Sequence, residues 1–128
     1  MNKVTGIGGI FFKAKDPKAL CDWYRKHLGI DIESWGGCAF QWKNDPQLDG
    51  GTTAFSIFPD TTKYLEPSTK PFMINFRVAD LHALVTALRA EGADVDAKTQ
   101  ESEFGKFAWV MDPEGNRIEL WEPPASAD

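Results

Sequence analysis

The chain has little of what secreted, membrane-embedded or metal-binding proteins need. Only two of its 128 residues are cysteines, Cys21 and Cys38, and they lack CxxC spacing, so we expect reduced structural thiols. No apolar run approaches the ~20 residues of a membrane span. Residues 1–12 lack the charged, apolar and small-residue order of a signal peptide. These absences predict a cytoplasmic protein without a membrane partner.

Positive charge is also scarce and scattered. The chain has 14 basic and 19 acidic residues, a net charge of −5. Neutralising nucleic-acid phosphates takes a basic stripe, which this pattern does not provide, so nucleic acid is not an expected partner. The two histidines, His27 and His82, fall within expected helices. We predict that both are solvated and that neither belongs to a functional site.

What the chain does contain is an internal repeat with a spacing of 64 positions. The segment FKAKDPKAL, residues 12–20, returns as FRVADLHAL, residues 76–84. Each copy predicts a strand and then an amphipathic helix. Aspartate stands at the expected N-cap of each helix, as Asp16 and as Asp80. Because the cap, the helix and the following pattern all recur, we interpret the two copies as equivalent structural modules.

Each expected helix ends at a glycine, Gly29 or Gly92, and is followed by three strand-like runs. The runs cover residues 30–34, 37–42 and 52–58 in the first half, and 95–97, 104–111 and 117–121 in the second. Residues 101–106 form either a mobile edge or a solvated hairpin, and we favour the hairpin. The sequence therefore predicts one α+β domain over residues 1–128, with the plan βαβββ twice. Its parts are module one (4–60), a linker (61–70), module two (71–123) and a tail (124–128).

The end of the chain carries a family resemblance. Residues 111–123, MDPEGNRIELWEP, look like the closing hairpin of the vicinal oxygen chelate superfamily, which includes glyoxalases, bleomycin resistance proteins and extradiol dioxygenases. Residues 23–29, WYRKHLG, resemble the end of that family's first helix. The likeness covers residues 4–123. It implies curved mixed sheets that form a cup, helices on the outer faces, and a homodimer.

The resemblance also indicates where metal-using members hold their ion. Their ligands come from the first and last strands of each module, which correspond here to Gly9, Ser56, Met73 and Glu119. Of these, only the carboxylate of Glu119 is a good ligand for a divalent ion. We therefore expect no metal and no cofactor. Zinc, manganese, nickel or iron would be held at most weakly, at that single carboxylate.

Strand alternation predicts which side chains line the cup, because residues two apart share a face. With the ligand positions defining the inner face, Asn75 lies on it while Ile74 and Phe76 turn toward the helix. The predicted ligand-binding residues are Phe11, Ser56, Phe58, Met73, Asn75, Arg77, Arg117 and Trp121, and Glu119 is the one candidate catalytic residue. An apolar wall with few polar groups is typical of a small-molecule site. Alternatively, the aromatic residues fill the space and Glu119 pairs with Arg77 or Arg117.

Three functions are open at this point. The first is a metal-free protein that binds and sequesters a planar or aromatic small molecule, as bleomycin resistance proteins do. The second is a lyase or isomerase of the glyoxalase type that uses Glu119 as general base. The third is a stress-response or scaffold protein with a closed cup. The loss of three ligand positions favours binding, with a small organic molecule as partner.

Overall fold

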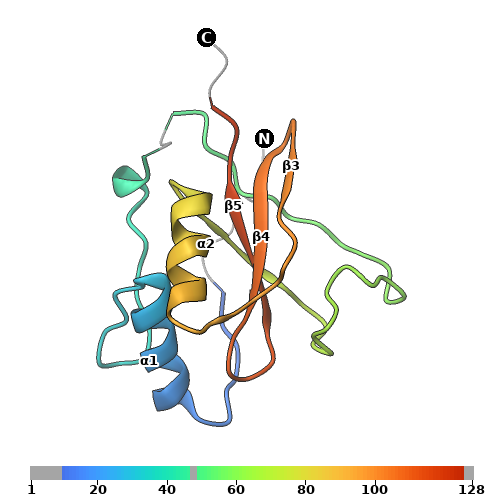
Figure 1. The fold of residues 1–128 in the computed structure, drawn as a ribbon. Helices are drawn as coiled ribbons and strands as arrows, with labels where there is room; N and C mark the ends of the chain where they lie inside the picture. Colours follow the sequence, from blue (N-terminus) through green and yellow to red (C-terminus); the bar gives the residue numbers. More distant parts are fainter. Residues whose placement is uncertain (1–9, 47–48, 126–128) are drawn as a thin grey trace, which may run out of the picture.

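A mixed sheet with two helices on one side forms the body of the protein (Figure 1). The computed structural model describes residues 10–46 and 49–125. Its elements are α1 (Pro17–Leu28), the short 3-10 helix η1 (Trp42–Asn44), β1 (Ile74–Arg77), α2 (Leu81–Ala90), β2 (Asp94–Val95), β3 (Gln100–Ser102), β4 (Gly105–Met111) and β5 (Arg117–Glu122). The strand order is β1-β5-β4-β2, and β3 also pairs with β4. This arrangement confirms the predicted α+β class.

The second module forms as the sequence predicts. β1 leads into α2, and three strand regions follow it. β5 pairs with β1 in parallel and with β4 antiparallel. The first of these strand regions is split, because β2 and β3 each pair antiparallel with β4 and the residues between them leave the ladder. Residues 101–104 are exposed at the hairpin between β3 and β4, which confirms a solvated hairpin there.

The strands predicted in the first module are wrong for the described residues. Residues 30–34, 37–42 and 52–58 form no ladder, and η1 occupies part of the second run. A strand needs a neighbouring strand to pair with its backbone groups, and residues 51–60 are exposed throughout. Alternating side chains therefore do not suffice to make these runs strands. Of the first module's expected elements, the helix is confirmed as α1.

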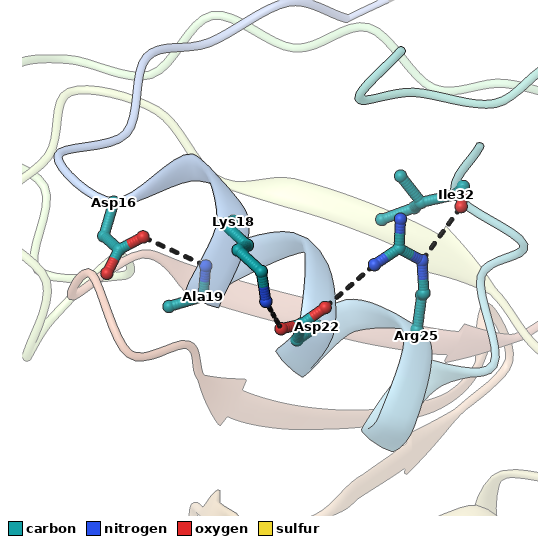
Figure 2. A network of polar contacts seen from close by, with 6 residues as sticks. All are labelled: Asp16, Lys18, Ala19, Asp22, Arg25 and Ile32. Carbon is teal, nitrogen blue, oxygen red and sulfur yellow. Dashed lines mark hydrogen bonds and ion pairs between the residues drawn. The ribbon is translucent and has the colours of Figure 1, made fainter. Parts of the chain in front are cut away.

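Both helices begin at the predicted aspartates. The side chain of Asp16 accepts a hydrogen bond from the backbone N–H of Ala19 at 3.1 Å, and Asp80 does the same at the start of α2. Figure 2 shows the cap of α1 together with the exposed ion pairs of Asp22 with Lys18 and Arg25. Gly29 ends α1 with a φ of 65°, in the left-handed region that glycine adopts readily.

The apolar faces of α1 and α2 pack on the same side of the sheet (Figure 1). Neither helix is long enough to be stable alone, so this burial is what holds them. The core residues are Leu20, Tyr24, Leu81, Val85, Leu88, Ala108, Val110, Ile118 and Leu120. Within the described part of the chain, no helix is long and apolar enough to cross a membrane.

The two histidines differ in their surroundings. His82 is exposed, as predicted, and its Nε2 lies 2.8 Å from Oε1 of Glu101. His27 is not solvated: its side chain is only 10% exposed, and Nδ1 lies 2.7 Å from Oε2 of Glu91. Its ring also packs against Trp23, with centroids 5.1 Å apart. The two helices lie side by side, and His27 therefore connects their C-terminal ends.

Both cysteines are free.

A buried carboxylate in the β4–β5 turn connects the second module to α1. Asp112 accepts hydrogen bonds from the hydroxyl of Tyr24 at 2.9 Å and from the side chain of Asn116 at 2.7 Å. The backbone N–H groups of Glu114 and Asn116 donate to its other oxygen. The side chain of Glu114 in turn accepts from two backbone N–H groups just before α1. The turn thus fixes α1 against the sheet.

Replacing Tyr24 with phenylalanine tests this connection. Burial, followed by the charge of and hydrogen bond to Asp112, raises the pKa of Tyr24. The bond therefore stabilises the fold at neutral pH, and its contribution is lost as the pH rises above the usual tyrosine pKa of ~10. We expect Tyr24→Phe to lower the free energy of unfolding by about 1–2 kcal/mol at pH 7 in urea titrations. The variant should also lose less stability than wild type above pH ~10. Equal stability of the two proteins at pH 7 would contradict the role given to this bond.

Candidate ligand-binding site

The sheet face opposite the helices carries the predicted site residues of the second module. Along β5, Arg117, Glu119 and Trp121 alternate with core residues and share this face. The parallel register places Asn75 beside Glu119 and Arg77 beside Trp121. In Figure 1 the helices lie in front of the sheet, whereas the green segment of the chain passes behind it. Asn75, Arg77, Arg117, Glu119 and Trp121 therefore share the face of β1 and β5 that is turned away from the helices.

Glu119 lies at the centre of this face and is only 7% exposed. Its Oε1 accepts a hydrogen bond from Nδ2 of Asn75 at 2.8 Å. Its Oε2 accepts two, from Nε1 of Trp109 at 2.9 Å and from the hydroxyl of Tyr64 at 2.5 Å. A buried carboxylate needs such donors, because it has lost its hydration. Three neutral groups from three segments thus hold one carboxylate in place.

Tyr64 contributes a phenol to the site from the segment between the modules. Its ring stands nearly at right angles to the rings of Trp109 and Phe58, with centroids 6.1 and 5.7 Å away. Burial, followed by the hydrogen bond to and the charge of Glu119, raises the pKa of Tyr64. Arg117 opposes this shift to a smaller extent. The phenol therefore keeps its proton and donates to the carboxylate.

Arg77 lies at one end of the face and covers an aromatic surface. Its guanidinium carbon is 5.5 Å from the centroid of the Trp121 ring, within cation–π range. Its Nε lies 3.1 Å from Oδ2 of Asp45. On its other side Trp121 stacks nearly parallel to Phe107, at an interplanar angle of 9°. Arg77 thus forms its ion pair with an aspartate of the first half, not with Glu119.

Arg117 lies at the other end of the face and is buried. Its guanidinium carbon is 5.0 Å from the centroid of Trp109, and its NH1 group lies 3.4 Å from Oδ2 of Asp96. Its Nε has no hydrogen-bond partner in the described part of the structure. The alternative that Glu119 pairs with an arginine is therefore wrong for this residue as well. Each arginine is neutralised by an aspartate, which leaves Glu119 to neutral donors.

The predicted residues of the first half are less well enclosed. Phe11 is 95% exposed, Ser56 is exposed, and Phe58 is about half exposed. They line a wide hollow of about 2360 Å³ that also reaches Met73 and Glu119. Residues from both faces of β1 line this hollow, so it extends around the edge of β1 that pairs with no strand of the described residues. The structure brings these side chains to one open space without packing them into a closed cup.

The residues at the family's metal-ligand positions do not fit a metal. Gly9 lies outside the described residues. Ser56, Met73 and Glu119 line the same hollow, but a hydroxyl, a thioether and one carboxylate make a poor donor set for a divalent ion. Both oxygens of Glu119 also already accept hydrogen bonds. Among residues 10–46 and 49–125, no group of three or more histidine, cysteine, aspartate or glutamate side chains is arranged to hold an ion.

Two residues of the site were not predicted from the sequence. Trp109 had a usable signal, because the turn between β4 and β5 sets an antiparallel register in which Trp109 faces Glu119. Applying that register to the predicted hairpin would have found it. Tyr64 had none. It belongs to an irregular segment without periodicity, so no pattern relates its position to a strand.

The comparisons with known proteins agree with the fold. Residues 9–121 match a family model described as a glyoxalase-like domain. TnmS3, an antibiotic binding protein from Streptomyces, is 20% identical over 97% of this chain and 100% of its own, with a TM-score of 0.61. A lactoylglutathione lyase from Agrobacterium tumefaciens is 19% identical over 94% of this chain and 96% of its own, with a TM-score of 0.59.

A third solved structure has the same fold. It is a glyoxylase/bleomycin resistance protein/dioxygenase domain from Frankia, 19% identical over 95% of this chain and all of its own, with a TM-score of 0.56. No curated protein matches the sequence. At these identities the solved structures show a shared fold only. The function must therefore be inferred from the residues of the site.

Removing the carboxylate should show how far the site depends on it. In Glu119→Leu the donors of Asn75, Trp109 and Tyr64 lose their acceptor, and the indole N–H of Trp109 is buried. We expect a loss of about 1–3 kcal/mol in the free energy of unfolding, measured in urea. Glu119→Gln, which keeps the shape and one acceptor oxygen, should lose less. Wild-type stability in Glu119→Leu would show that these hydrogen bonds do not hold the site together.

Proposed function

The chain belongs to the family of the glyoxalase-like domain, and from that premise we propose that it is a metal-free protein that binds a planar or aromatic small molecule. The observation that carries the proposal is the site of Glu119, a buried carboxylate held by neutral donors beside aromatic side chains. Few polar groups on an apolar wall are typical of a small-molecule site. The antibiotic-binding description of TnmS3 supports the same class of function.

The geometry supports a simple division of roles. Trp121 and Phe58 line the open hollow and offer aromatic surfaces on which the flat part of a ligand can pack. Glu119 and Asn75 offer a hydrogen-bond acceptor and an amide at a defined point between them. Aromatic contacts would supply most of the affinity, and the polar pair would select orientation. The open hollow beside the face leaves room for a ligand larger than one ring.

The same contacts favour binding over proton transfer. A general base must reach the proton of its substrate within about 2.6–3.2 Å with a free oxygen. Oε2 of Glu119 already accepts from Trp109 and Tyr64, and Oε1 accepts from Asn75. Three of the about four acceptor positions of this carboxylate are thus already used, and the one that is left can accept a hydrogen bond from a ligand. The homodimer and the cytoplasmic location stay predictions of the sequence.

Binding is tested with a panel of planar aromatic compounds. We expect at least one compound to raise the melting temperature of wild type and to quench its tryptophan emission. Trp121→Phe should lose part of that quenching, whereas Trp23→Phe, on the helix side of the sheet, should keep it. Asn75→Ala should weaken binding about tenfold, the value of one hydrogen bond to a ligand group. If no planar compound shifts the melting temperature, the proposed function is wrong.

The absence of a metal is tested separately. Glu119 is the single good metal ligand beside Ser56 and Met73. We therefore expect protein purified without added metal to contain no stoichiometric zinc, iron, manganese or nickel. A metal bound only to the folded state would stabilise that state, and a chelator would then lower the melting temperature. Because we expect no bound metal, chelator should leave the melting temperature unchanged. Elemental mass spectrometry makes the measurement. One tightly held equivalent of metal would contradict this part of the proposal.

A further inference from the structure

The segment between the modules crosses the ligand face and ends in an anchored turn. We call residues 61–70 the strap. Ser68 is buried, and its hydroxyl donates to the carbonyl oxygen of Gly115 at 2.7 Å while accepting from the backbone N–H of Lys70. The strap is thereby attached to the β4–β5 turn at its C-terminal part. Its preceding residues carry Tyr64 to the carboxylate of Glu119.

The remaining part of the strap is held to the sheet through the phenol of Tyr64. Backbone hydrogen bonds of the strap before residue 69 are local, from Thr62 to Pro59, from Glu66 to Lys63 and from Ser68 to Leu65. Tyr64 is 40% exposed although its hydroxyl reaches a carboxylate that is only 7% exposed. Its ring therefore lies at the mouth of the site. It can leave without disturbing the core between the helices and the sheet.

Tyr64 occupies the site as a small aromatic ligand would. Its hydroxyl donates to Oε2 of Glu119, and its ring meets Trp109 and Phe58 at angles of 87° and 86°. These are edge-to-face contacts, an arrangement that aromatic rings favour. The acceptor and the two flanking rings thus form a place for a phenol. The protein fills that place with its own side chain.

We infer that Tyr64 is a built-in ligand and that the site recognises aromatic hydroxyl compounds, which displace its phenol from Glu119. This inference rests on the proposed function and names its ligand class. A phenolic ligand would replace one O–H donor to Oε2 by another, so the buried carboxylate would not lose its hydrogen bond during the exchange. A carboxylate-bearing ligand would bring a second negative charge to Glu119, which disfavours it.

The tether explains why a bare phenol should bind wild type poorly. A group attached by a short flexible segment competes at an effective concentration in the millimolar range. A single-ring phenol must exceed that value to displace Tyr64, whereas a larger ligand gains additional contacts in the hollow. Removing the side chain of Tyr64 removes the competitor. The empty place should then accept a free phenol.

The test compares p-cresol with toluene, which has the same ring and methyl group but no hydroxyl. In Tyr64→Ala, we expect p-cresol to bind about tenfold or more tightly than it binds wild type, and about tenfold more tightly than toluene binds the same variant. Calorimetry and thermal shift measure both. Tyr64→Phe is the matched control, because it keeps an aromatic ring at this position and loses the hydroxyl that competes for Oε2 of Glu119. It should bind p-cresol more tightly than wild type but less tightly than Tyr64→Ala, whose ring is gone as well.

Two further variants complete the design. Tyr64→Ala combined with Glu119→Gln should lose most of the preference for p-cresol over toluene, since the charged acceptor is gone. If Tyr64→Ala does not fold, the binding of p-cresol and toluene is compared in Tyr64→Val instead, which leaves a smaller space. Binding of p-cresol by neither variant, or equal binding of p-cresol and toluene, would overturn the inference.

The outcomes separate this inference from the proposed function. If wild type binds a planar compound of the panel while the Tyr64 variants ignore p-cresol, the built-in ligand is wrong and the binding function stands. If the variants select p-cresol while wild type binds no compound of the panel, the built-in ligand is supported. In that case the proposed function of the native chain fails.

Discussion

β5 is hydrogen-bonded on both sides, in parallel to β1 and antiparallel to β4, and the other features of the second module depend on this pairing. Its alternation buries Ile118 and Leu120 beneath the helices and turns Glu119 toward the opposite face. A slip of one residue would exchange the two sets, placing a carboxylate in the apolar core. The packing of α2 and the position of the ligand face therefore follow from one register.

Two buried carboxylates connect the first half of the chain to this sheet, each through a tyrosine. Asp112 accepts from Tyr24 of α1, and its other donors belong to its own turn. Glu119 accepts from Tyr64 and Asn75, which border an open hollow, and from the buried indole of Trp109. Tyr24 is 5% exposed and Tyr64 is 40% exposed. The first pair is therefore structural, whereas the second is placed where a ligand can replace it.

The first half shows the limit of reasoning from pattern. Residues 52–58 alternate as a strand would, yet they remain exposed and unpaired among the described residues. Helix α1 was predictable because its cap, its apolar stripe and its terminal glycine act within a few residues. A strand depends on a partner that is distant in the sequence. The same half of the chain thus contains a confirmed helix and strand predictions that fail.

By itself the sequence determined the elements whose causes are local or periodic: the two capped helices, the β4–β5 hairpin, and the face of β5 that carries Glu119. It also determined that three of the four family ligand positions lack a metal-binding side chain of the usual kind. Only the tertiary structure decided what Glu119 contacts. Tyr64 reaches it from 55 positions away through an irregular segment, and each arginine turns to an aspartate instead. Such contacts depend on how distant segments pack, and no periodicity in the chain encodes that packing.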